Sequence, residues 1–220
     1  MSIVQPHPAG WFVERAANDV SAPIIVGIGG TIRDQSSSQK ALQRCMHFAA
    51  NLGARTFTIT GTQMPVEIYD PSRQERSVEA TRLVNLLRSA DGVIIASPAY
   101  HGSISGHLKN ALDYTEDMRG DAAPYLDGRA VGVICCAMGW QAGGATLGAM
   151  RSIVHALRGW PTPMGVLINS TEARFDESDR CSVPAIDDQL RIMAGQVFEF
   201  ASRSFSTRAK SAAALAVPAE

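Results

Sequence analysis

The chain of 220 residues contains little cysteine and no paired cysteine motif. It has four cysteines, with no CxxC pair and no cysteine–histidine set at the spacing of a zinc site. Cys135 and Cys136 are adjacent in the apolar run "AVGVICCA", where two small buried hydrophobes are the expected role. We therefore expect no disulfide framework and no metal site, and reduced thiols fit a cytoplasmic protein.

The chain also lacks an excess of charge and a long apolar run. It carries 20 basic and 21 acidic residues, a formal net charge of -1, which gives no electrostatic case for nucleic acid or for an anionic membrane. No apolar run approaches the ~20 residues that span a bilayer. The first residues lack the basic and apolar regions of a signal peptide. We expect a cytoplasmic protein with no nucleic-acid or membrane partner.

The two common nucleotide-binding loops are also missing. A dinucleotide fingerprint in "GIGGTI" would need glycine where Ile32 stands, and an acidic residue after the second apolar run, where Thr60 and Gly61 stand. The phosphate loop GxxxxGK[ST] is absent. A loop that holds phosphate in this chain must therefore be of another kind.

From Pro23 onward, short apolar runs alternate with amphipathic helical segments. Continuous apolar strands joined by helices indicate a parallel sheet covered on both faces. We predict an α/β fold, a flavodoxin-like doubly wound five-stranded parallel sheet with helices on both faces. The expected strands are 23–29, 55–60, 93–97, 129–137 and 163–169, and the expected helices are 38–54, 77–92, 105–118, 145–160 and 186–205. The domain is expected over 23–206, with an N-terminal extension over 1–22 and a flexible C-terminal tail over 207–220.

Right-handed crossovers place the loops after the first, third and fourth strands at one carboxyl edge of this sheet. The first loop, "GGTIRDQSSSQKAL", gathers hydroxyls and one guanidinium just before a helix. A helix start offers unpaired N–H groups and the positive end of the helix dipole, which suits a phosphate monoester. The alternative is a serine N-cap on a flexible loop. The donors are Thr31, Arg33, Ser36, Ser37 and Ser38.

The second loop, "SPAYHGSISGHLKN", is rich in residues that packing does not require. Pro98 stiffens the exit from the strand, and Gly102 and Gly106 let the backbone approach a ligand closely. With the flat face of Tyr100, such a loop suits the edge of a planar ring, and the alternative is an ordinary capped turn. His101 is a candidate general acid, although a lone loop histidine is more often simply solvated.

The third loop, "AMGWQAGGATLG", has three glycines that permit close backbone approach, Gly139, Gly143 and Gly144. Trp140 stands among them. Three roles are open for it: a lid, an interface residue, or a partly buried anchor.

These segments resemble one known family. "GGTIRDQSSSQKAL" resembles the GSxRxxSxxxxL-type phosphate loop of the NAD(P)H-dependent FMN reductase family. "SPAYHGSISGHLKNALDY" resembles the family's SPxYxGSxSGxLKNALD segment, which is long and specific. "MPVEIYDP" resembles its LPxYDP-type connection, and "YLDGRAVGVICCAMG" its entry to the fourth strand. The resemblance covers about residues 23–170.

The resemblance implies a flavodoxin-like oxidoreductase and flavoprotein that assembles as a homodimer or homotetramer. Its cofactor would be FMN, with NADPH or NADH as co-substrate, and the flavin rather than a catalytic side chain would carry the chemistry. Two positions depart from the family pattern: Thr31 stands where serine is usual, and His101 where several members have asparagine. The resemblance assigns Thr31, Arg33, Ser36 and Ser38 to the phosphate, Pro98, Ala99, Tyr100, His101, Gly102 and Ser103 to the ring edge, and Gly139 to the other side of the ring.

The implied reaction is hydride transfer from the nicotinamide to FMN. We expect the reduced flavin to be supplied to a partner monooxygenase. The alternative is a reductase that keeps its FMN and reduces quinones, azo compounds or metal oxyanions. A non-enzymatic flavin electron carrier is a second alternative, against which the near-neutral charge argues, and a relative that has lost its flavin is a third.

Overall fold

The structure is a computed structural model that describes residues 22–215, with side chains up to residue 205. The N-terminal extension expected over residues 1–22 therefore lies almost entirely outside the described residues. Within the described part, no helix is long and apolar enough to cross a membrane.

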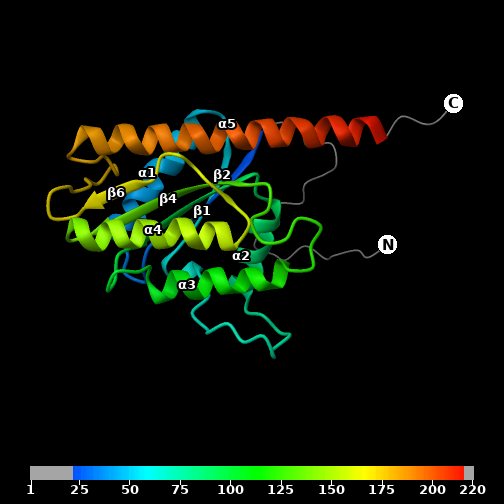
Figure 1. The fold of residues 1–220 in the computed structure, drawn as a ribbon, viewed down its shortest axis with the longest axis horizontal. Coiled ribbons are helices and arrows are strands. Elements are labelled where there is room, and N and C mark those ends of the chain that lie inside the picture. The colour runs from blue at the N-terminus through cyan, green and yellow to red at the C-terminus, as the bar shows by residue number, and fades with distance from the viewer. Residues whose placement is uncertain (1–21, 216–220) are drawn as a thin grey trace.

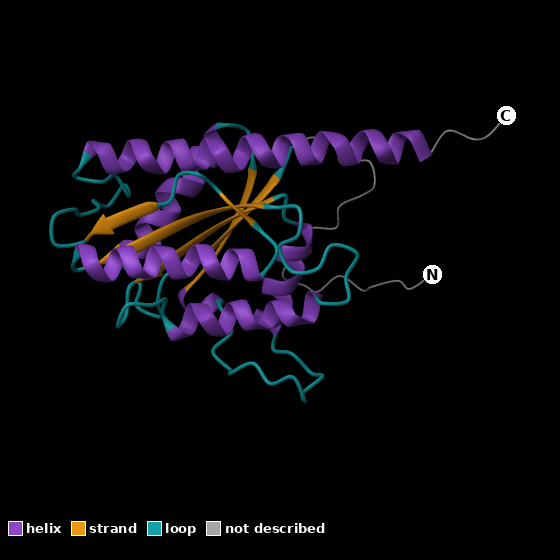
Figure 2. Ribbon diagram, viewed as in Figure 1, coloured by secondary structure: helices purple, strands orange, loops and turns teal. Residues whose placement is uncertain are grey.

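A parallel sheet forms the centre of the molecule, in the order β2-β1-β3-β4 with β5 and β6 both paired to β4 (Figures 1 and 2). The predicted doubly wound flavodoxin-like fold is confirmed. The strands are β1 (Ile24–Gly29), β2 (Arg55–Thr60), β3 (Gly92–Pro98), β4 (Ala130–Ala137), β5 (Trp160–Pro161) and β6 (Val166–Asn169).

The fifth strand predicted over 163–169 is shorter in the structure, where it is β6, and the separate two-residue strand β5 precedes it. β5 pairs with the beginning of β4 at Ala130 and Val131, and β6 pairs with its end. Pro163 lies between β5 and β6, where proline has no N–H to donate to the ladder. β5 and β6 together occupy the position expected for one strand.

Helices cover both faces of the sheet (Figure 1). On one face Leu42 and Leu190 belong to a core that includes the buried side chain of Ile25. On the other face Leu83, Leu108 and Met150 pack with the alternate β1 residues. The first face is covered by α1 (Ser37–Asn51) and α5 (Pro184–Leu215), and the second by α2 (Val78–Ser89), α3 (Gly106–Asp113) and α4 (Trp140–Ala156). Short 3-10 turns, η1 (Gly61–Gln63) and η2 (Tyr114–Met118), follow β2 and α3.

The bounds of α4 and α5 differ from expectation. α4 begins at Trp140 rather than at residue 145, so Gly143 and Gly144 lie in a helix and not in a loop. A Cβ at Gly143 would lie 2.9 Å from a methyl group of Leu167, which shows that this glycine lets α4 approach β6. α5 continues to Leu215, into the segment expected as a flexible tail.

The amino end of the sheet is closed by two buried charged residues. The Asp91 carboxylate accepts a 2.8 Å hydrogen bond from the Ile24 N–H, and the Asp91 N–H donates back to the Ile24 carbonyl. Burial lowers the pKa of the Arg129 guanidinium below its usual value. This guanidinium donates at 2.9–3.2 Å to the carbonyl oxygens of Arg88, Ala90, Tyr125 and Asp127.

Candidate functional site

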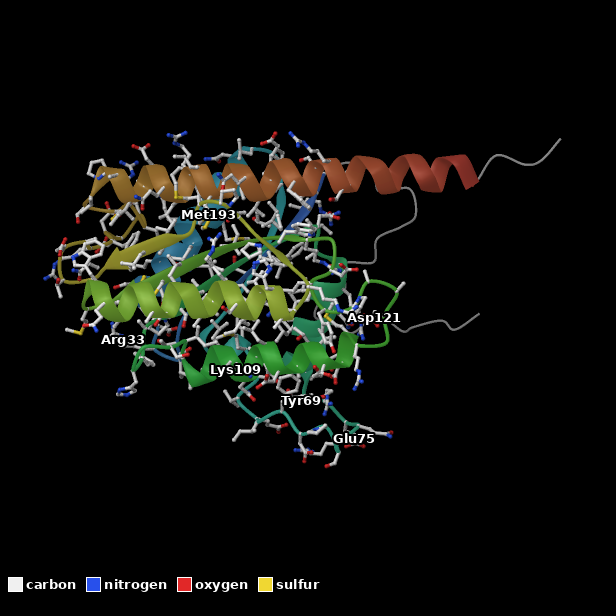
Figure 3. The ribbon with its side chains drawn as sticks, in the orientation of Figure 1. Arg33, Tyr69, Glu75, Lys109, Asp121 and Met193 are labelled. Carbon is white, nitrogen blue, oxygen red and sulfur yellow. The ribbon has the colours of Figure 1, made fainter. Side chains whose placement is uncertain are left out.

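Three loops leave adjacent strands at the carboxyl edge of the sheet, as predicted. The Gly30 N–H donates to the Ala96 carbonyl at 3.0 Å, which joins the first loop to β3. The Ala99 N–H donates to the Cys136 carbonyl at 2.8 Å, which joins the second loop to β4. Figure 3 places Arg33 at the side of the molecule toward which the β6 arrow points. The structure therefore brings the predicted phosphate, ring-edge and third loops to one rim.

The first loop is a compact turn that leaves its guanidinium exposed. The Thr31 hydroxyl accepts from the Arg33 N–H at 3.1 Å and lies 3.2 Å from the Arg33 carbonyl, to which it donates. Gln35 adopts a positive φ of 56°, and its N–H donates to the Gln39 side chain. Among the described residues, no hydrogen bond or ion pair holds the Arg33 guanidinium. This side chain is therefore available to an anionic ligand.

The serines at the start of α1 are compatible with both expected roles, a helix cap and a phosphate site. Ser36 is the N-cap, and its hydroxyl accepts from the Gln39 N–H at 3.3 Å and lies 3.3 Å from the Ser38 hydroxyl. Both serines are buried. The first intrahelical bond runs from the Lys40 N–H to the Ser36 carbonyl, so the N–H groups of Ser37 and Ser38 remain as the free donors that a helix start leaves. Capping and anion binding are thus compatible here.

The second loop is a tight two-residue turn. The Tyr100 N–H donates to the Ser103 carbonyl at 2.9 Å, and the Ser103 N–H donates back to the Tyr100 carbonyl at 3.1 Å. Between them His101 and Gly102 have φ values of 52° and 80°, the pattern of a type I′ hairpin. Histidine shares with asparagine an increased tolerance for positive φ. This explains why His101 can stand where the family pattern often has asparagine.

These bonds reduce the number of free donors that the second loop offers. The N–H groups of Ala99, Tyr100 and Ser103 are all used within the protein, and Pro98 has none. Of the six ring-edge residues, only His101 and Gly102 have a backbone N–H that makes no bond within the part of the chain that the structure describes. The loop is therefore stiffer, and its backbone donates at fewer places, than its composition alone suggests.

Ser97 and Ser105 hold the two ends of the second loop. The buried Ser97 hydroxyl accepts from the Ser105 N–H at 3.0 Å and donates to the Pro98 carbonyl at 2.8 Å. The Ser105 hydroxyl in turn accepts from the Leu108 N–H and caps α3. The segment between the two serines is thus fixed relative to both β3 and α3.

The third loop has open space at Gly139, and exposed apolar side chains lie along the same rim. Gly139 is the N-cap of α4, and a Cβ there would meet no other atom within 4 Å. Four large apolar side chains are exposed along this rim: Ile32, Tyr100, Met138 and Trp140. Free anion donors at one end and open, partly apolar loops at the other fit a phosphorylated planar ring such as FMN.

One segment of the family pattern has a structural role. The Asn110 side chain accepts from the Tyr69 N–H at 2.8 Å and donates to the carbonyls of Pro65 and Glu67. It therefore links "LKNALD" to "MPVEIYDP" along α3, where Figure 3 shows Tyr69 beside the helix. Arg76 reinforces this link because it lies 4.9 Å from the Tyr69 ring and pairs with Asp117.

The two thiols of β4 are buried. Cys135 and Cys136 lie in β4, as predicted, and burial raises the pKa of the Cys135 thiol to about 11. Burial also raises the pKa of Cys136. A thiolate nucleophile is therefore not available from this strand near neutral pH.

The loop after β6 also reaches the carboxyl edge, and the sequence interpretation missed it. The Ser170 N–H donates to the Ala137 carbonyl at 2.8 Å, which joins this turn to the end of β4. The Glu172 carboxylate accepts from the Trp140 indole N–H. The segment contains no glycine to attract notice, but the rule that ligands bind at the carboxyl ends of the strands would have included it.

Comparisons with known proteins agree with this geometry. A family model described as NADPH-dependent FMN reductase matches residues 23–173. An NADPH azoreductase of Bacillus sp. (strain OY1-2) is 27% identical over 56% of this chain and 67% of its own. An FMN reductase (NADPH) of Pseudomonas putida is 24% identical over 76% of this chain and 82% of its own.

Solved structures share the fold. FerB, a flavoenzyme NAD(P)H:(acceptor) oxidoreductase from Paracoccus denitrificans, superposes with a TM-score of 0.68 at 16% identity, over 83% of this chain and 99% of that one. A flavodoxin, WrbA-like protein from Agrobacterium tumefaciens has a TM-score of 0.56 at 14% identity, over 84% of this chain and 99% of that one. The family match covers well over half of the chain, which therefore belongs to the NADPH-dependent FMN reductase family, flavodoxin-like oxidoreductases that use FMN with NADPH or NADH.

Proposed function

We propose that this NAD(P)H-dependent FMN reductase holds FMN at the carboxyl edge of β1, β3 and β4. The observation that carries the proposal is the pairing, on one rim, of a helix start with unused donors and a rigid turn with an open side. An anion site and a stiff edge at adjacent strands match the two ends of a flavin mononucleotide.

The phosphate lies at the start of α1. Arg33 supplies a charge-assisted hydrogen bond, and the N–H groups of Ser37 and Ser38 point toward the anion as the helix dipole favours. The Ser36 hydroxyl accepts from the Gln39 N–H, and the Ser36 and Ser38 hydroxyls share one hydrogen bond, so one of their two protons remains to be donated to the phosphate. Thr31 shapes the loop through its bonds to the Arg33 backbone.

The ring edge lies along residues 98–103, with Gly139 on its other side. The free N–H groups of His101 and Gly102 are the backbone donors for the ring edge, while Pro98, Ala99, Tyr100 and Ser103 set its shape. N–H dipoles aimed at the ring stabilise negative charge there without reorganisation. When bound, FMN supplies a hydride acceptor, and the chain binds it, orients it and leaves one face for the nicotinamide.

The electron acceptor is either free FMN or a second aromatic compound. In the first case the reduced flavin leaves to supply a partner monooxygenase. The second case, a reductase of quinones, azo compounds or metal oxyanions that retains its FMN, is favoured by the relatives named as NADPH azoreductases. We further propose a cytoplasmic homodimer or homotetramer, on the family resemblance.

Steady-state NADPH and NADH oxidation tests this proposal, with FMN, FAD, riboflavin, a naphthoquinone and an azo dye as acceptors. We expect FMN to be preferred over riboflavin, since riboflavin lacks the phosphate that Arg33 binds. Turnover that needs excess flavin supports the first acceptor, and quinone or azo reduction with one FMN per chain supports the second. Equal use of FMN and riboflavin, or no oxidation with any acceptor, contradicts the proposal.

A further inference from the structure

An exposed tryptophan is held in one orientation at the carboxyl edge. Trp140 is the first residue of α4 and directly follows Gly139, and 57% of it is exposed. Its indole N–H donates to Glu172 at 3.1 Å. More than half of the residue is thus open to a contact, while the hydrogen bond restricts the rotation that a surface side chain would otherwise have.

Glu172 is itself held by the turn after β6. The same carboxylate oxygen accepts from the Asn169 side chain at 2.6 Å. Asn169 is buried, its side-chain oxygen accepts from the N–H and the hydroxyl of Thr171, and its carbonyl accepts from the Glu172 N–H. The turn is joined to β4 by two bonds from Ser170 to the Ala137 carbonyl. The orientation of the indole is thus tied to the core of the sheet.

The sheet order places Trp140 at a defined point of the rim. The phosphate loop follows β1, the ring-edge loop follows β3, and Trp140 follows β4, with the Glu172 turn after β6. Trp140 is therefore on the side of the ring-edge loop that faces away from the phosphate loop. If a flavin ring binds against residues 98–103, Trp140 therefore lies beyond the side of that ring that faces away from the phosphate loop.

A second exposed tryptophan provides a contrast. Trp160 is 60% exposed and belongs to β5, which pairs with the beginning of β4 at the amino end of the sheet. Within the described residues its indole makes no hydrogen bond. Two tryptophans of equal exposure thus differ in their place and in whether a side chain fixes them.

We propose that Trp140 forms an aromatic wall for flat aromatic electron acceptors, such as quinones and azo compounds, and that Glu172 is the positioning residue that fixes its indole. This inference rests on the proposed function, because it requires FMN at the adjacent loops. Offset or edge contacts between aromatic rings would favour such acceptors over compact ions. A ring held in advance loses less freedom when the acceptor binds.

The test uses the FMN-loaded full chain and five substitutions: Trp140→Ala, Trp140→Phe, Glu172→Ala, Glu172→Gln and, as the matched control, Trp160→Ala. KM and kcat are measured with 2-methyl-1,4-naphthoquinone and, separately, with ferricyanide, which has no aromatic ring. We expect Trp140→Ala to raise the KM for the quinone roughly three- to tenfold, the range of one aromatic contact, with kcat and the ferricyanide reaction unchanged. Trp140→Phe retains an aromatic ring, so its KM for the quinone should stay close to that of the wild type.

Glu172 is tested by rescue. Glu172→Ala should raise the quinone KM in the same direction by a smaller factor, because the indole remains but can rotate. Glu172→Gln keeps an oxygen that accepts from both Trp140 and Asn169, so its KM should return close to that of the wild type. A purely structural role for Glu172 would instead alter both acceptors, and that result would overturn its assignment.

Equilibrium binding gives a readout independent of turnover. In a chain with Trp11→Phe and Trp160→Phe, the naphthoquinone without NADPH should quench the remaining Trp140 fluorescence in a saturable way. Glu172→Ala should weaken this binding. Absent quenching, or a Trp140→Ala chain that matches the wild type with the quinone, overturns the inference. Visible spectra report FMN loading separately, and a wild-type chain that does not bind FMN overturns the proposed function as well.

Discussion

The two ends of the sheet differ in whether their hydrogen-bond donors have partners within the protein. At the amino end, Arg129 donates to four carbonyls, and Asp91 closes the start of β1. At the carboxyl end, the Arg33 guanidinium has no partner within the described residues, and the first turn of α1 keeps free N–H groups. Donors that the chain itself satisfies contribute to stability, whereas donors left open are available to a ligand.

The contrast predicts that substitutions at the two ends affect different measurements. A change at the amino end should lower the free energy of unfolding and leave ligand affinity unchanged. Removing an open donor at the carboxyl end should weaken ligand binding and leave the free energy of unfolding unchanged. The following predictions test this separation, from the largest expected effect to the smallest.

Arg129→Met should have the largest effect. It leaves buried carbonyls such as that of Ala90 without a donor, so the free energy of unfolding should fall by about 3 kcal/mol. Urea denaturation measures this loss. The FMN affinity of the folded fraction should remain within a factor of two, and a selective loss of FMN binding would break the comparison.

Arg33→Ala should act in the opposite way. FMN binding should weaken by roughly 1.5–3 kcal/mol, the range for a hydrogen bond to a charged group, while stability stays constant because the side chain is exposed. Titration by flavin fluorescence measures the affinity. Riboflavin is the control ligand: its affinity should not change, and an equal loss for both flavins would place Arg33 away from the phosphate.

Gly102→Ala tests the turn with Gly106→Ala as its matched control. A Cβ at either glycine meets open space, but only Gly102 has a positive φ, of 80°. Gly102→Ala should therefore cost about 1 kcal/mol of unfolding free energy and should weaken FMN binding, since the turn presents the ring-edge donors. Gly106→Ala should leave stability unchanged or slightly higher. Equal destabilisation by the two would show that φ is not the cause.

An ion pair between α1 and α5 predicts the smallest effect. Arg44 of α1 pairs with Asp187 of α5 and holds the pKa of that carboxyl below its usual value. The resulting stability is present above the unfolded pKa, about 3.9, and is lost as the pH falls through the lower folded pKa. Asp187→Asn should thus cost about 0.5–1 kcal/mol at pH 7 and progressively less below pH 4. A cost that is constant with pH would contradict the ion-pair explanation.

The sequence predicted the strands, most helices and the three loops because their signals are local. The run before Ser97 and the glycines and serines after it are readable without a partner. What the sequence could not provide depends on distant neighbours. The start of α4 at Trp140 depends on Gly143 packing against Leu167, and the short strand β5 depends on its pairing with β4.

The sequence predicted that three loops meet at one edge of the sheet, but not how their backbone donors are used. The letters of residues 98–103 indicate a stiff turn, yet only the structure shows that the N–H groups of Ala99, Tyr100 and Ser103 are already used. The Asn169–Glu172 turn was missed because its function depends on an indole far away in the sequence. Serine as a cap and serine as a phosphate donor were alternatives from sequence, and the geometry of Ser36 makes them compatible.

The most direct test of the account is a titration of FMN into the purified chain, followed by visible absorption. The account predicts saturable binding of one FMN per chain with a perturbed flavin spectrum, weakened by Arg33→Ala and Gly102→Ala and unaffected by Trp160→Ala at the opposite end of the sheet. An unperturbed flavin spectrum, or binding that survives both substitutions at the carboxyl edge, would contradict it.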